Sequence, residues 1–212
     1  MLSLWKRFIS MKEIVIVLLC LAVLANALRK PGSQQNQYAL PKPFNFPMSK
    51  IANLAILLQP GDGKHGEIFE ALDYLCPPCH MRESQFAELR RENPLLSWSV
   101  LPFPLHMHPG SYGYALAALE ANREGLYNLY QQKVMSEFPA AGIGPERYLR
   151  NLDPELVRSW QLRFSNKSQE ESRLNQIKKL PIDGTPTLIA FNSVGKAIKT
   201  FSPGDAMAFC KS

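Results

Sequence analysis

The sequence has few cysteines, a single CxxC pair, no block of like charge and no internal repeat. Four cysteines in 212 residues are too few for a scaffold stapled by disulfides. A zinc site would want a second pair of ligands at matching spacing, and the chain has no second CxxC. The net charge of +6 is mild and scattered, without a stripe of arginine and aromatic residues. These absences argue against a disulfide framework and against a nucleic-acid-binding protein.

The first 27 residues are typical of a targeting segment. Three basic side chains precede an apolar run over residues 14–25, and Ala25-Asn26-Ala27 puts small residues at the −3 and −1 positions of a cleavage site. The run is short for a membrane span, which needs about 20 residues. We therefore expect a cleaved export signal over 1–27, with a retained anchor or a buried helix as alternatives. An exported chain works where disulfides persist, outside the cytosol.

The close pair Cys76-Pro77-Pro78-Cys79 follows directly on an apolar run. If a helix begins at this point, the Cys76 thiolate faces the positive end of the helix and its pKa falls. Cys76 is then the attacking thiol, and Cys79, one turn further, is the resolving thiol that releases a mixed disulfide. The alternatives are half of a zinc site or two inert core cysteines.

The two prolines between the cysteines are expected to modulate the pair. Pro77 and Pro78 both lack an N–H group, so two donors that could face the Cys76 thiolate are absent. A less stabilised reduced form makes a weaker oxidant. Alternatively, the dipeptide only rigidifies the turn.

A second candidate element is Gly184-Thr185-Pro186-Thr187, far downstream of the cysteines. A cis bond before Pro186 would lay the backbone of Thr185 beside Cys76. Its N–H and C=O groups could then hold a substrate chain as an added strand. The alternative is an ordinary trans proline in a turn before a strand.

Two titratable residues near the pair are candidates for supporting roles. Glu70 lies six residues before Cys76 on the expected strand, where a carboxylate could move protons for Cys79. Asp73 has the opposite strand parity, so we expect only one of the two acids to face the site, and we favour Glu70. His80, as a cation, would favour the nearby thiolate; otherwise it is a plain helix residue.

Two histidines could bear on a metal-binding alternative. His106 and His108 form an H-x-H after the third expected strand, and with the cysteine pair they could hold copper or zinc. A polar loop is the simpler interpretation of this motif. Cys210, near the C-terminus, is expected to be a small apolar helix residue.

The apolar patterns predict an α/β protein with a long helical stretch inside it. Residues 28–50 are polar and broken by prolines, and they are expected to form an extended linker. Helices are expected from Pro77 to Arg91, within 106–179 and over 203–210. Strands are expected over 53–59, 67–75, 95–105, 187–191 and 196–201.

Three stretches, FEALDYLCPPCH, LPFPLHMHPGS and LNQIKKLPIDGTPTLIAFN, resemble the DsbA-like branch of the thioredoxin superfamily over roughly residues 50–210. The resemblance implies a thioredoxin domain of residues 51–105 and 180–212. The resemblance further implies a helical domain, residues 106–179, inserted between the third strand and the cis-proline strand. It also implies thiol–disulfide exchange with cysteine-containing client proteins in the bacterial periplasm or at the cell surface, with no cofactor beyond the redox-active disulfide.

The same resemblance matches the attacking and resolving thiols to Cys76 and Cys79, the cis-proline to Pro186 with Thr185 before it, and the buried acid to Glu70. A membrane redox partner is implied as well. The best-known oxidase has Pro-His between its cysteines, whereas this chain has Pro-Pro, which leaves reductase or isomerase roles open. Residues 28–50 are too few for the N-terminal dimerisation domain of the isomerases, so a monomer is implied.

Overall fold

The computed structural model describes residues 41–139, 142–165 and 169–212. The export signal expected over 1–27, and the greater part of the linker expected over 28–50, lie outside these ranges. No helix within them is both long and apolar enough to cross a membrane.

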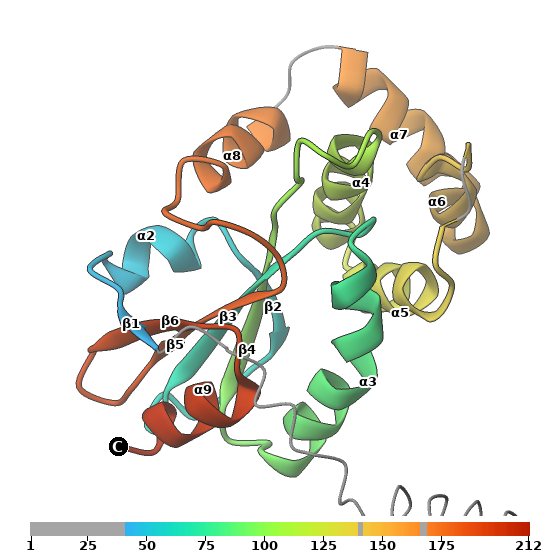
Figure 1. Ribbon diagram of the computed structural model, residues 1–212. Coiled ribbons are helices and arrows are strands. Elements are labelled where there is room, and N and C mark those ends of the chain that lie inside the picture. The colour runs from blue at the N-terminus through green and yellow to red at the C-terminus, as the bar shows by residue number, and fades with distance from the viewer. Residues whose placement is uncertain (1–40, 140–141, 166–168) are drawn as a thin grey trace, which may run out of the picture. The chain divides into compact units, whose positions relative to one another are not determined.

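The described residues contain one mixed sheet of six strands in the order β1-β6-β5-β3-β4-β2 (Figure 1). β3 pairs in parallel with β4, and the other neighbouring strands are antiparallel. The strands are β1 Lys42–Pro43, β2 Ile56–Gln59, β3 Glu67–Leu72, β4 Ser97–Pro102, β5 Thr187–Phe191 and β6 Ala197–Thr200.

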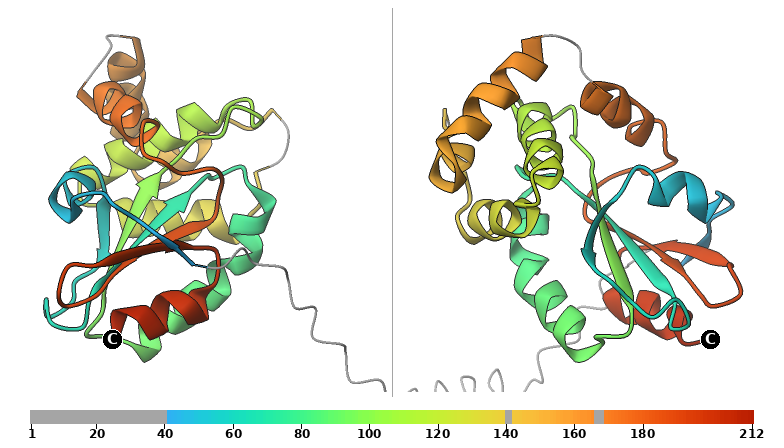
Figure 2. Two further views of the ribbon diagram at one scale, coloured as in Figure 1. Left: turned by 60° about the vertical axis from the view of Figure 1, so that its left-hand side comes forward. Right: turned by 180° about the vertical axis from the view of Figure 1, so that it is seen from behind.

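Helices cover both faces of this sheet. Helices α3 and α9 pack on one face, and α2 packs on the other together with helices that follow β4. Figure 2 shows α4 to α7 gathered to one side of the sheet. The helices are α2 Met48–Ala52, α3 Pro77–Glu92, α4 Ser111–Arg123, α5 Tyr127–Ser136, α6 Glu146–Leu152, α7 Pro154–Ser165, α8 Gln169–Ile177 and α9 Pro203–Cys210.

The central strand β3 carries one set of side chains to each face. Ile68 joins a core cluster with residues of α3 and α9, whereas Phe69 and Ala71 join the larger cluster on the other face. This alternation is the two-residue period of a strand, and both faces are apolar because both are covered. Glu70 has the parity of Ile68 and therefore faces α3.

Helices α4 to α8 all lie between β4 and β5, which agrees with the helical insert expected over 106–179. The strands are shorter than the sequence patterns suggest, because β3 ends at Leu72 rather than at residue 75 and β4 occupies only Ser97–Pro102. The residues between Leu72 and Cys76 instead form a turn that leads into α3.

The prediction of an extended linker over 28–50 is wrong for the C-terminal part of that range. Residues 42–43 form the edge strand β1, paired with β6, and α2 begins at Met48. Phe44 is buried in the main core, and its N–H donates to the carbonyl oxygen of Ala197 at 3.0 Å. A strand of two residues is too short to show an alternation of apolar and polar side chains. In a proline-rich segment, the sequence therefore gave no sign of it.

Candidate active site

Cys76 is the residue that precedes the first turn of α3. Its φ of −87° and ψ of 114° are extended, and Pro77 and Pro78 occupy the first two helical positions. Proline suits these positions because its fixed φ is helical and its missing N–H would lack a partner there. The N–H groups of Cys79 and His80 donate to the carbonyl oxygen of Cys76 at 3.0 and 3.3 Å. The sequence thus sets Cys76 at the N-terminus of the helix.

The loop before β5 lies against the Cys76 thiol. The Sγ atom of Cys76 donates to the carbonyl oxygen of Thr185 at 3.4 Å, and the peptide bond between Thr185 and Pro186 is cis. The sheet explains this contact, since Thr187, the first residue of β5, pairs with Ala71 near the end of β3. Two segments more than a hundred residues apart in the sequence therefore meet at the cysteine pair.

The two thiols of the pair are free and have opposite electrostatic environments. A hydrogen bond from the Cys79 thiol, aided by the Thr185 side chain and the Cys79 N–H, lowers the pKa of Cys76 to about 6, although burial and the charge of Asp73 oppose this. Burial and the nearby Cys76 raise the pKa of Cys79 well above its ordinary value. Cys76 is chemically suited to attack as a thiolate, and Cys79 to remain a thiol until a mixed disulfide forms.

Asp73 is a buried carboxylate in the turn between β3 and Cys76, and the sequence pattern did not favour it. Its Oδ1 accepts from Leu75 N–H and the Ser111 hydroxyl, and its Oδ2 accepts from Leu105 N–H and His108 Nδ1. The carbonyl oxygen of Asp73 also accepts from the Cys76 N–H at 3.1 Å. Strand parity failed here because β3 ends before Asp73, so parity does not govern where this side chain points.

Glu70 is also fully buried, on the face of the sheet that α3 covers. The Trp98 indole N–H donates to its Oε2 at 3.1 Å, and Arg90 of α3 lies 4.0 Å from the same oxygen. Burial, together with the charge of Glu83, raises the pKa of Glu70 to about 8, although Arg90 and Trp98 act in the other direction. A proton-transfer role for Glu70 stays a prediction.

His80 makes contacts with backbone oxygens and with an aromatic ring. Its Nε2 lies 2.7 Å from the carbonyl oxygen of Tyr74 and its Nδ1 lies 3.3 Å from that of Met135. The ring packs edge-on against Phe138, with centroids 4.9 Å apart. Met81, the next residue, is 77% exposed and so does not belong to the buried face of α3.

The described part of the chain holds no ligand cluster that would support the metal-binding alternative. No three His, Cys, Asp or Glu residues there are arranged to hold an ion. His106 is exposed, and His108 bonds to Asp73 at 2.8 Å.

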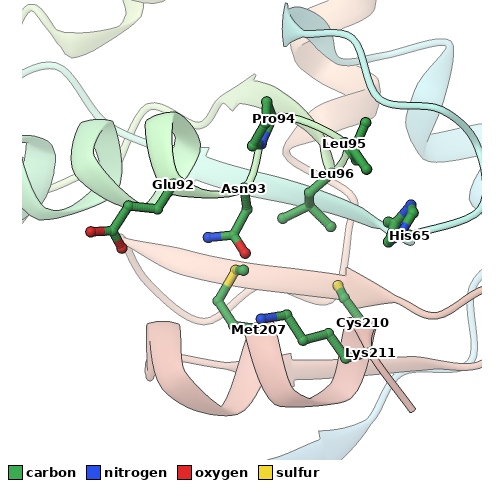
Figure 3. Close-up of a pocket in the computed structure, with 9 residues that line it drawn as sticks. All are labelled: His65, Glu92, Asn93, Pro94, Leu95, Leu96, Met207, Cys210 and Lys211. Atoms are coloured by element: carbon green, nitrogen blue, oxygen red, sulfur yellow. The ribbon is translucent and has the colours of Figure 1, made fainter.

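Cys210 lies away from the pair, on α9. It is buried against apolar side chains, and burial raises the pKa of its thiol to about 12. Figure 3 shows it with Met207 beside a cavity of about 200 Å³ that the C-terminal end of α3 also lines. Because Cys76 is at the other end of α3, this cavity is not part of the site.

Neither a protein-family model nor a curated protein matches the chain. Solved structures do match it. A thioredoxin-like oxidoreductase from Silicibacter pomeroyi is 24% identical with a TM-score of 0.57, over 68% of this chain and 84% of the other. The thiol-disulfide exchange protein alpha-DsbA2 from Wolbachia pipientis is 15% identical with a TM-score of 0.58, over 76% and 91%.

A periplasmic thioredoxin-like protein from Salmonella enterica is 14% identical with a TM-score of 0.51, covering 74% of this chain and 88% of the other. At these levels of sequence identity, the similarity to the solved structures shows a shared fold and nothing more specific. The chain has the thioredoxin fold with a helical insert that DsbA-like proteins share, as the sequence resemblance implied.

Proposed function

We propose that the protein is an exported thiol–disulfide oxidoreductase that exchanges disulfides with client proteins through Cys76 and Cys79. The observation that carries this proposal is the asymmetry of the pair: a thiol with its pKa lowered to about 6 at a helix N-terminus, beside a buried thiol with a raised pKa. Such a pair favours nucleophilic attack by one sulfur and resolution by the other. The matched structures include proteins described as an oxidoreductase and as a thiol-disulfide exchange protein, which supports the same chemistry.

The reaction follows from this arrangement. A client thiolate attacks Cys76 of the disulfide form, and Cys79 leaves as a thiolate and takes up a proton; the two-electron reduction of the pair is complete when Cys76 is released in the next step. A second client thiolate then attacks the client sulfur of the mixed disulfide and releases Cys76. In the reverse direction, Cys76 attacks a client disulfide and Cys79 resolves the mixed disulfide. Thr185, whose carbonyl faces the Cys76 sulfur, would pair with the client backbone.

We further propose that the protein is a weaker oxidant than a pair with a polar residue between its cysteines. Pro77 and Pro78 offer no N–H to the thiolate, which leaves the Cys79 N–H as the backbone donor that lowers the pKa of Cys76. Fewer donors at the thiolate stabilise the reduced form less, which lowers the reduction potential.

The equilibrium reduction potential in a glutathione series, read by thiol alkylation of residues 28–212, tests this function. A two-electron couple that Cys76→Ser abolishes and Cys210→Ser leaves unchanged would support exchange through the pair. A potential near the thioredoxin end of the range would support the weaker oxidant, and one near the strong-oxidant end would contradict it. The absence of any couple would overturn the oxidoreductase.

Location and partners belong to the same proposal. The basic and apolar segment over 1–27 supports export, and one matched structure is described as periplasmic. We propose a monomer that is recycled by a membrane redox partner. Fractionation of cells that carry a tagged full chain, with the N-terminus of the mature protein sequenced, would test export and cleavage. Cytoplasmic retention would contradict both.

A further inference from the structure

The segment that leads to Thr185 decides where the backbone of that residue lies beside Cys76. Residues 178–186 connect α8 to β5 in a wide curve without helix or strand (Figure 1). Ile182 anchors the middle of this segment in the main core. A Cβ at Gly184 would meet no atom within 4 Å, so packing does not hold the chain directly before Thr185. Polar contacts are therefore needed to hold this part of the segment.

Lys199 of β6 contacts the segment at two points. Its ammonium donates to the carbonyl oxygen of Pro181 at 2.7 Å and to Oδ2 of Asp183 at 2.8 Å. The hydrogen bond from Lys199 lowers the pKa of Asp183, so this residue is a carboxylate at neutral pH. The lysine side chain is only 15% exposed, although lysine is mostly an exposed residue. One covered cation thus holds the residues on both sides of Ile182.

The sheet gives this contact a fixed base, and a second polar contact lies beyond it. Lys199 pairs with Ile189 of β5, the strand that begins directly after the segment. The hydroxyl of Thr187, the first residue of β5, donates to the carbonyl oxygen of Gly184 at 2.6 Å. Thr185 therefore lies between two polar contacts that both come from neighbouring strands of one sheet.

We propose that Lys199 is a positioning residue for client binding: it holds residues 181–183 against β6 and thereby keeps the backbone of Thr185 in place beside Cys76. The inference rests on the proposed exchange of disulfides, in which an extended client pairs with the backbone of Thr185. The Sγ atom of Cys76 lies 3.4 Å from the Thr185 carbonyl oxygen, so a shift of that backbone would move a bound client cysteine away from the sulfur. A backbone already held in its binding geometry lowers the cost of binding.

This role distinguishes polypeptide clients from small thiols. A polypeptide uses the backbone of Thr185, whereas dithiothreitol has no peptide backbone and needs only access to the Cys76 sulfur. The chemistry is the same for both. The disulfide of Cys76 and Cys79 accepts two electrons and the dithiol becomes a disulfide, with the protons passing to the protein thiols or to solvent. Loss of Lys199 should therefore slow the reaction with a polypeptide and leave the reaction with dithiothreitol unchanged.

The test is reduction of the oxidised protein by an extended peptide that carries two cysteines, and separately by dithiothreitol. Rapid mixing with acid quench measures each rate over a range of concentrations. In Lys199→Met the peptide concentration at half-maximal rate should rise about threefold to tenfold, as expected for the loss of a hydrogen bond. The maximal rate with the peptide, and the rate with dithiothreitol, should stay at the wild-type values.

Two further variants sharpen the comparison. Lys199→Arg keeps a cation with several donors and should restore most of the peptide affinity. Lys196→Met is the matched control, because it removes an exposed lysine directly before β6, and it should behave like wild type. If Lys199→Met does not fold, Lys199→Gln makes the same comparison, because its side chain is shorter and uncharged.

The outcomes separate the inference from the proposed function. The same dependence on peptide concentration in Lys199→Met and wild type would overturn the inference. An equal loss with the peptide and with dithiothreitol would also overturn it, because damage to the fold alone affects both reactions. A wild-type protein that neither reagent reduces would instead remove the proposed function.

Discussion

At the residue scale, the sulfur of Cys76 decides the chemistry, and its ionisation can be followed directly. With a pKa lowered to about 6 by its hydrogen bond from Cys79, it should be mainly thiolate at pH 7. We expect the rate of alkylation by iodoacetamide to rise with pH around a midpoint near 6. Cys210, with its pKa raised to about 12 by burial, should stay unreactive over the same range. A midpoint near 8.5, the value of an ordinary thiol, would contradict the thiolate assignment.

Glu70 gives a second residue-scale prediction, this time on stability. Its folded pKa of about 8 lies above the unfolded value near 4.5, so its favourable contribution is complete below pH 4.5 and is lost as pH rises toward 8. Glu70→Gln should therefore match wild type near pH 4 and exceed it near pH 8, by on the order of a few kcal/mol. Urea unfolding at the two pH values measures this difference.

The control for Glu70 is Glu88→Gln on α3, where an exposed carboxylate pairs with the exposed Arg91. That variant should differ little from wild type at either pH, since exposed pairs contribute about 0–1 kcal/mol. If Glu70→Gln and wild type are equally stable at pH 8, ionisation of the buried Glu70 carboxyl costs little folding free energy, which would contradict the prediction.

At the element scale, the start of α3 follows from local rules and sets the donors around the thiolate. Pro77 and Pro78 hold the first two helical positions. Pro78→Ala restores an N–H in the first turn. One added donor to a charged group contributes about 1.5–3 kcal/mol, which would raise the reduction potential by about 30–60 mV. The glutathione equilibrium measures this shift. A lowered potential would contradict the argument from missing donors.

Individual helices and strands also differ in how well local sequence patterns predict them. The helix from Pro77, strand β5 and helix α9 have strong local signals, namely a proline at the first helical position, an apolar run and a Ser202 cap. The edge strand β1 has two residues, and its partner β6 is more than 150 residues away in the sequence. No local period can reveal such a pairing, because the partner strand alone defines it.

At the scale of the whole molecule, the CxxC pair and the GTPT segment could be read from the sequence, since both are short motifs. The cluster around Asp73 could not, because three of its four donors come from a loop and a helix some 35 residues further on. A cue did exist in retrospect: an acid three residues before Cys76 and a His-x-x-Ser at the start of the insert. Only the fold brings them together.

A single cooperative unit is expected for the sheet and the insert, because polar contacts join them at two places. Asp73 ties the start of α4 to the turn after β3. At the other end, Arg173 of α8 donates to the carbonyl oxygens of Leu54 and Ala55 at 2.9 and 2.6 Å, just before β2. In residues 28–212, which lack Trp5, Trp98 in the sheet and Trp160 in α7 can report on each part separately. Thermal unfolding followed in Trp160→Phe and Trp98→Phe variants, each compared with its own calorimetric midpoint, should give one transition for both probes.

Arg173→Leu should weaken this unit. The substitution leaves two backbone oxygens without the guanidinium, and each lost hydrogen bond to a charged donor costs about 1.5–3 kcal/mol. The midpoint should fall by several degrees, at about 2–4 °C per kcal/mol for a chain of this size. Arg158→Leu, on the exposed side of α7, is the matched control and should unfold close to wild type. If Arg173→Leu separates the two tryptophan transitions, the contact at α8 is what couples the insert to the sheet. If it leaves the midpoint unchanged, α8 is held by its apolar face, through the buried Leu174 and Ile177, instead.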